Sequence, residues 1–163
     1  MSYVSNKRYE DSKVMGNTSQ TLFVKACEKI NYKCTPSTIE VDMYSHIDYY
    51  VETPEGRLIS VDVKGNNKLE EIWIEFNNVR GKEGWLYGKA NYIAFDIPEL
   101  NCFVVVGRNE LRERCEGIVE KVFVSKSEAL RKWYQRKDRF DIISKIHLTD
   151  FKDLKSYRII KYA

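Results

Sequence analysis

Three charged residues in one short stretch of the chain are of types that could form a site for a metal ion. The segment HIDYYVETPEGRLISVDVKG, residues 46–65, contains Asp48, Asp62 and Lys64 among apolar side chains. Carboxylate oxygens are ligands that Mg²⁺ prefers, and a bound metal ion can neutralise charge that develops on a phosphate. This chemistry requires that the three side chains lie close together.

A β-hairpin would bring the two carboxylates together. Residues 46–51 and 59–64 alternate apolar and polar side chains with a period of two, which is typical of half-buried strands. The tripeptide at 54–56, Pro-Glu-Gly, suits a three-residue hairpin loop in which Gly takes a left-handed conformation. Counting outward from a Thr53–Arg57 pair gives the cross-strand pairs Tyr50–Ser60, Asp48–Asp62 and His46–Lys64.

Two carboxylates that face each other repel. Directly opposed residues have Cβ atoms roughly 5 Å apart, where like charges destabilise a strand pair. Three arrangements would offset the repulsion between Asp48 and Asp62: a shared proton, a salt bridge from Lys64, or a bound cation. The residues alone leave all three open, and a surface salt-bridge cluster is the alternative without function.

The rest of the chain predicts an α/β or α+β domain with a central mixed β-sheet flanked by helices. Apolar periodicity predicts a helix at 18–30, capped by Thr18 or Ser19, and a helix near 109–117. Ser125 and Glu128 form a capping-box pattern that predicts a third helix at 126–137. The predicted strands, besides the hairpin, are 70–76, 91–97, 102–107, 121–124, 141–148 and 156–162, and the glycine-containing stretch 77–90 is expected to be a long loop or a short irregular helix.

Length and composition indicate a single intracellular domain. The chain has 163 residues, enough for one core, and residues 1–163 are treated as one domain. No apolar run approaches the roughly 20 residues of a membrane span, and the first residues lack the apolar segment of a signal peptide, so a soluble cytoplasmic protein is expected. Four cysteines without a C-x-x-C pair favour packed, reduced thiols over zinc or disulfides, and two histidines argue against catalysis by several histidines.

Basic charge is concentrated at the C-terminal end, in an extension that starts near residue 125. From Lys126 onward there are 11 Lys or Arg against five Asp or Glu, whereas the whole chain has 27 against 24. Such asymmetry indicates a polyanionic partner, with an ordinary solvated surface as the alternative.

Several residues are candidates for contact with nucleic acid. Trp85 and Tyr87 lie between basic residues, as in a stacking platform flanked by cations, although aromatic residues that pack in the core are the alternative. The predicted helix at 126–137 would place its basic residues on one face, which either follows phosphates or is simply solvated. The complete candidate set is His46, Arg80, Lys82, Trp85, Tyr87, Lys89, Arg131, Lys132 and Arg136.

The acidic residue Asp48 followed by Asp62-Val63-Lys64 resembles the PD-(D/E)XK nuclease superfamily, in particular its phage and bacterial restriction-endonuclease-like or Holliday-junction-resolvase-like members. That signature is an acidic residue near the start of one strand and D/E-x-K on the next, and no Pro precedes Asp48 here. The resemblance covers about residues 18–106. It implies a restriction-endonuclease-like core and a metal-dependent nuclease, either a DNA endonuclease or a junction-processing enzyme.

The resemblance also implies roles for individual residues. Asp48, Asp62 and the carbonyl of Val63 would hold Mg²⁺ or Mn²⁺, and Lys64 would orient the attacking water or stabilise the charged phosphate, a role we favour over proton abstraction. Many members carry Glu on the first helix where this chain has Gln20, so the number of metal ions stays open. Glu75 either completes the metal shell or pairs with a lysine.

The expected partner is nucleic acid, DNA rather than RNA, and a homodimer stays open. The alternative function is a non-catalytic module on a nuclease fold that binds nucleic acid or protein. Retention of both aspartates and the lysine argues for the nuclease, and Gln20 argues for the module.

Overall fold

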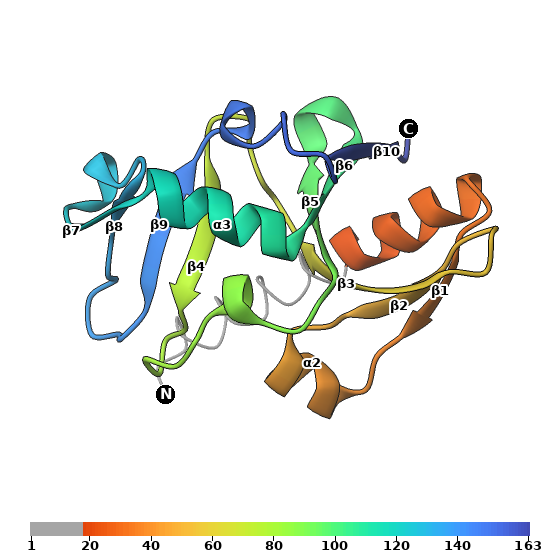
Figure 1. Cartoon of the computed structure of the whole chain (residues 1–163), viewed down its shortest axis with the longest axis horizontal. Helices are drawn as coiled ribbons and strands as arrows, with labels where there is room; N and C mark the ends of the chain where they lie inside the picture. The colour runs from red at the N-terminus through yellow and green to blue at the C-terminus, as the bar shows by residue number, and fades with distance from the viewer. Residues whose placement is uncertain (1–17) are drawn as a thin grey trace.

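A central six-stranded mixed sheet organises the chain. The computed structural model describes residues 18–163, and within them the sheet order is β1-β2-β3-β5-β6-β10 (Figure 1). All neighbouring strands are antiparallel except β3 and β5, which are parallel. The strands of this sheet are β1 (Lys33–Pro36), β2 (Tyr49–Glu52), β3 (Leu58–Lys64), β5 (Tyr92–Ile97), β6 (Cys102–Gly107) and β10 (Arg158–Lys161). The predicted mixed sheet flanked by helices is confirmed.

Two smaller sheets lie at one end of the molecule. β4 (Ile72–Asn77) pairs antiparallel with β9 (Ile142–Ile146), and β7 (Glu120–Phe123) pairs parallel with β8 (Lys132–Trp133). Figure 1 shows these strands on the left, opposite the end formed by β1 and β2. The helical elements are a helix at 18–29, α2 (Ile39–Ser45), α3 (Arg108–Ile118) and the short 3₁₀ helices η1 (Trp85–Tyr87), η2 (Pro98–Leu100), η3 (Lys126–Glu128) and η4 (Leu148–Asp150).

Each face of the central sheet has its own apolar core because successive side chains of a strand point to opposite faces. On β5, Ile93 and Phe95 belong to the core shared with β4, η1 and α3, whereas Ala94 belongs to the core shared with the helix at 18–29. β6 continues the same alternation, with Val104 on the first side and Phe103 on the second. The sheet therefore lies between the helix at 18–29 and a second layer built from β4, β9 and α3.

The predicted hairpin forms with the predicted loop and register. Thr53 donates its N–H to the carbonyl of Arg57, Gly56 has φ of +83°, and Tyr50 pairs with Ser60. β2 begins only at Tyr49, however, because the chain before it forms α2 and turns at His46. His46 has φ of +55° and caps α2, so the predicted His46–Lys64 strand pair is wrong.

The helix predicted at 126–137 is also wrong. Only η3 is helical there, and Arg131 has a left-handed φ of +56° that breaks any α-helix. The N–H of Arg131 donates to the carbonyl of Lys145, and β8 follows at once. Pairing with distant strands has thus overridden a local helical preference. The predicted N-cap Ser19 lies inside its helix, where it is buried and donates from Oγ to Asp96 Oδ2 at 2.8 Å.

Candidate metal and phosphate site

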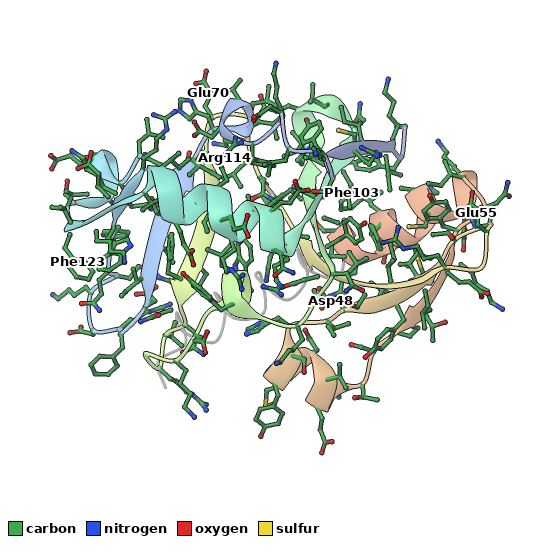
Figure 2. All side chains as sticks on the ribbon, in the orientation of Figure 1. Asp48, Glu55, Glu70, Phe103, Arg114 and Phe123 are labelled. Atoms are coloured by element: carbon green, nitrogen blue, oxygen red, sulfur yellow. The ribbon has the colours of Figure 1, made fainter. Side chains whose placement is uncertain are left out.

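The site is built at the start of β2 and the end of β3. The N–H of Asp48 donates to the carbonyl of Val61 at 2.9 Å, which fixes Asp48 against β3 directly before β2 begins. Figure 2 shows Asp48 between α2 and the helix at 18–29. Asp62 and Lys64 share one face of β3, two residues apart. The structure therefore brings the three residues predicted to be catalytic together.

Asp62 is the most deeply buried charged group of the site. The residue is 2% exposed, its Oδ1 lies 3.2 Å from Lys64 Nζ, and its Oδ2 is buried without a hydrogen-bond partner among the described residues. Burial raises the pKa of this carboxyl, and the Lys64 ammonium opposes that rise. A buried carboxylate oxygen without a donor is costly, and either a proton shared with Asp48, whose hydrogen bond lowers the pKa of Asp62, or a bound cation would offset that cost.

Lys64 is held on two sides. Besides the ion pair with Asp62, its Nζ lies 5.1 Å from the centroid of the Trp85 ring, within the range of a cation–π contact. Burial lowers the pKa of Lys64, but the carboxylates of Asp62, Asp48 and Glu75 together outweigh it and hold the pKa above its ordinary value. Lys64 is therefore a fixed cation suited to electrostatic stabilisation, and it is poorly suited to accept a proton.

Two hydrogen bonds orient Asp48. Oδ2 accepts the N–H of Val63 at 2.7 Å, and Oδ1 accepts from Gln20 Nε2 at 3.3 Å. Burial and the charge of Asp62 raise the pKa of Asp48 to about 6, although the Val63 N–H lowers it. Gln20 therefore lies at the site, as predicted, and acts on the carboxylate of Asp48 through a neutral amide.

A third carboxyl group, Asp42, belongs to the site and was missed by sequence reasoning. Thr38 caps α2 by accepting the N–H of Val41 at 3.2 Å, and Asp42 follows in the first turn. Asp42 remains exposed to solvent, and partial desolvation by its neighbours, the charge of Asp48 and a hydrogen bond with Asp48 raise its pKa to about 6. The signal was present in the sequence, since Thr38 followed by Glu40 and Asp42 is a typical helix start.

His46 lies near this cluster as the C-cap of α2, and not as the predicted strand partner of Lys64. Burial and the positive charge of Lys64 lower the pKa of His46 and so favour its neutral form. Gly88 packs against His46, because a Cβ at that glycine would lie 3.1 Å from the Cβ of His46. Lys89 is joined to the end of α2 by its N–H, which donates to the carbonyl of Ser45 at 2.9 Å.

Glu75 supports the loop that carries Trp85. Its Oε1 accepts the N–H of Trp85 at 3.2 Å, and a Cβ added at Gly84 would lie 2.5 Å from the carbonyl oxygen of Glu75. Only glycine permits this close approach of the two segments. The predicted lysine partner of Glu75 is not among the ion pairs of residues 18–163, while the charge of Glu75 does reach Lys64. Its predicted place in a metal shell stays a prediction.

Of the two interpretations of Trp85, a stacking platform or a residue packed in the core, the structure supports core packing. This residue is 6% exposed and its ring packs edge-on against Phe95 in the core, so it has no free face for a base. Tyr87 is half-buried and donates from its hydroxyl to Glu116 Oε1 at 2.9 Å. The neighbouring Arg80, Lys82 and Lys89 are exposed and stay candidates for phosphate contact.

The predicted basic helix face does not exist. Arg131 donates to both carboxylate oxygens of Asp150 at 2.9 to 3.1 Å, and Arg136 donates from Nε to the fully buried Asp141 at 2.6 Å. Lys132 is half-buried on β8. The basic excess of this region is therefore partly neutralised within the fold: Arg131, directly before β8, binds Asp150 in η4, and Arg136 binds Asp141 within the loop between β8 and β9.

The donor set suits a cation that keeps part of its hydration shell. Among residues 18–163, no group of three or more His, Cys, Asp and Glu side chains is placed to hold a metal ion. Mg²⁺ keeps several waters and is commonly bound by one or two carboxylates together with substrate phosphates. This chain offers two such carboxylates, Asp48 and Asp62, and Oδ2 of Asp62 has no hydrogen-bond partner among residues 18–163.

Comparisons with protein-family models, with curated proteins and with solved structures found no match to this chain. In the part of the chain that the structure describes, no helix is both long and apolar enough to cross a lipid bilayer.

Proposed function

We propose that this protein is a metal-dependent nuclease that hydrolyses phosphodiester bonds of nucleic acid, with DNA as the preferred substrate. One observation carries the proposal. Asp62 is buried beside a second carboxylate, Asp48, and one of its oxygens has no partner although the other is paired with Lys64. A cation at this point would supply the missing partner and offset the repulsion between the two carboxylates.

Asp48, Asp62 and the carbonyl of Val63 are the groups that would hold Mg²⁺ or Mn²⁺. A bound ion of this kind supplies charge neutralisation at a phosphate and lowers the pKa of a coordinated water. The chain's own residues prepare the position. Gln20 and the N–H of Val63 orient the carboxylate of Asp48, and Trp85 with Asp62 fixes the ammonium of Lys64, where it can stabilise negative charge on the phosphate oxygens.

The arrangement supports the resemblance to PD-(D/E)XK nucleases. A helix precedes a hairpin, the first strand of the hairpin starts directly after an acidic residue, and the second strand carries D-x-K at its end. Exposed Lys89 is joined to the end of α2 directly before this hairpin, and exposed Arg80 and Lys82 lie on the loop between β4 and η1; all three are available to phosphates. An endonuclease or a junction-processing enzyme is the form of the activity that we propose.

The test is an incubation of the purified full-length protein with plasmid, linear, branched and RNA substrates in Mg²⁺, Mn²⁺ or EDTA. Cleavage that requires the metal and is lost in Asp62→Asn supports the proposal. Asp96→Asn is a matched control, because Asp96 is also buried on the central sheet but is satisfied by Ser19 and by the hydroxyl of Tyr162 at 2.9 Å.

Absence of cleavage with every substrate and both metals would refute the nuclease. If nucleic acid still bound under those conditions, the function supported would be that of a non-catalytic binding module.

A further inference from the structure

A groove next to the site is not used by the proposed cleavage chemistry. It lies where β4 and β9 meet η1, has a volume of about 350 Å³, and its walls include Trp73, Glu75, Trp85, Tyr134, Lys126 and Arg136. Figure 1 shows β4 and β9 side by side, with η1 close to the end of β4. Ligand sites for small molecules occupy about 300 to 1,000 Å³, so this groove has room for a single nucleotide or a group of that size.

Two aromatic side chains form one wall of the groove. Trp73 and Tyr134 are both half-buried, and their ring centroids lie 6.2 Å apart at an interplanar angle of 47°. They come from β4 and from the loop before β9, and the Tyr134 N–H donates to the carbonyl of Ile143 at 2.8 Å, which fixes that loop. Unlike Trp85, these rings are partly open to solvent, as a surface for base stacking requires.

Cations surround the aromatic wall. Lys126 is exposed at the edge of the groove, Lys145 Nζ lies 5.8 Å from the centroid of Trp73, and the Arg136 side chain is 41% exposed. Arg136 uses Nε for Asp141, and its two terminal nitrogens have no hydrogen-bond partner among residues 18–163. Glu75 is the one carboxylate in the wall, and its Oε1 is occupied by the N–H of Trp85.

One side chain, Trp85, lies between the groove and the cleavage site. Trp85 lines the groove and also lies under the ammonium of Lys64, 5.1 Å from ring centroid to Nζ. A nucleic-acid strand with one phosphate at Lys64 is therefore separated from the groove by Trp85 alone. Aromatic faces flanked by cations bind the bases of single strands, whereas paired bases inside a duplex are not exposed for such stacking.

We propose that the groove between β4, β9 and η1 binds an unpaired base of the substrate, so that the preferred nucleic acid contains a single-stranded segment beside the cleaved bond. This inference rests on the proposed nuclease function for the identity of the ligand. It gives Trp73 and Tyr134 the role of stacking the base, and it gives Lys126 and Arg136 the role of holding the adjacent phosphate.

Binding in EDTA separates this inference from catalysis. The probes are a fluorescein-labelled oligothymidylate, an abasic strand of the same length and a blunt duplex, each titrated with the full-length protein. The parent is expected to bind oligothymidylate more tightly than the other two. Trp73→Ala and Tyr134→Ala should each weaken binding of oligothymidylate roughly 5- to 150-fold, the range for one lost base stack, and should leave abasic binding unchanged.

Two control variants complete the design. Tyr32→Ala removes another half-buried aromatic residue, which packs against the core under the helix at 18–29, and it should leave all three affinities unchanged. Lys126→Gln should weaken binding of oligothymidylate and abasic strand alike and should reduce the dependence of log K on log salt by about 1.

The outcomes distinguish the groove from the nuclease. Equal affinity of the parent for the oligothymidylate and abasic strands, or unchanged affinity in Trp73→Ala and Tyr134→Ala, would overturn the groove assignment even if the protein cleaves DNA. Loss of base-dependent binding in those two variants supports the groove even if no substrate is cleaved in Mg²⁺ or Mn²⁺, a result that would refute the nuclease alone.

Discussion

Exchange of Asp62 for Asn should leave stability level or raise it, whereas exchange of Lys64 for Met should lower it, and both exchanges should slow cleavage. Asp62→Asn removes the charge that would recruit a cation while keeping the side-chain volume, and its carbonyl can still accept from Lys64. Lys64→Met removes the ammonium nearest to Asp62 and leaves Asp48 and Asp62 facing each other without it. Both variants should cleave at least about 100-fold more slowly, the usual cost of losing one preorganised electrostatic group.

The geometry of the ion pair sets the size of the stability effects. At 3.2 Å, the gross attraction between Lys64 and Asp62 is about 5 kcal/mol for an effective dielectric constant near 20. In Asp62→Asn this loss is offset by relief of the repulsion from Asp48 and of the cost of the unpartnered Oδ2, so stability should change by less than about 1 kcal/mol or rise. In Lys64→Met no such relief occurs, and the loss should be about 3 kcal/mol, because the Lys64 side chain is only 28% exposed.

Urea unfolding at pH 7 in EDTA measures both stability effects, and a cleavage assay in Mn²⁺ measures the activities. Asp96→Asn serves as the control, since it disturbs hydrogen bonds from two hydroxyl groups to a buried carboxylate. It should lose about 1 to 3 kcal/mol and keep its cleavage. The reasoning fails if Asp62→Asn is as destabilised as Lys64→Met, because the carboxylate pair would then not be a source of strain. Parental cleavage by both variants would place the active site elsewhere.

Three further predictions address the surroundings of the site. Without metal, the contribution of Asp48 to stability should fall by about 2 to 3 kcal/mol as the pH rises from 4 to 7, because the pKa of Asp48 is about 6 in the fold and near 3.9 unfolded; the stabilising proton is fully bound below about pH 4 and lost as the pH passes 6. Denaturant midpoints of the parent and of Asp48→Asn across that range in EDTA isolate this contribution, and parallel profiles of the two proteins would contradict it. Gly84→Ala should lower the free energy of unfolding by about 1 to 3 kcal/mol and slow cleavage, because the new Cβ displaces the Glu75 backbone and with it the support of the loop that carries Trp85. Thermal melts and the cleavage assay measure the two effects. Parental values in both would show that the two segments can separate freely. Arg131→Ala should destabilise the fold by about 1 to 3 kcal/mol, because the hydrogen bonds from the guanidinium group to Asp150 are lost, and nucleic-acid affinity should change little. A large loss of affinity at parental stability would instead identify Arg131 as a phosphate contact.

Local rules were sufficient for the hairpin that carries the site. Alternating apolar residues define the two strands, and the Pro-Glu-Gly loop fixes their register, so the position of Asp62 next to Asp48 follows from residues within 20 positions of each other. The amphipathic pattern at 18–30 also predicts the helix that carries Gln20. These features depend on backbone geometry and side-chain periodicity, which short segments determine by themselves.

The contacts that complete the site depend on tertiary structure. Trp85 lies beneath Lys64 only because η1 packs with β4 and β5 on one core and β3 pairs with β5, and no local pattern distinguishes that buried indole from an exposed stacking residue. Asp42 reaches Asp48 because the chain turns at His46, a left-handed residue within an apparently strand-like run.

The C-terminal third shows most clearly where local reasoning fails. Residues 126–137 have the pattern of a capped amphipathic helix, yet Arg131 takes a left-handed conformation and bonds to Asp150 while its N–H bonds to Lys145. Strand pairing and ion pairs with residues 14 to 19 positions away stabilise this arrangement by more than the small propensity difference between helix and strand. The sequence therefore determined which residues the hairpin could present, and long-range packing decided which groups surround them.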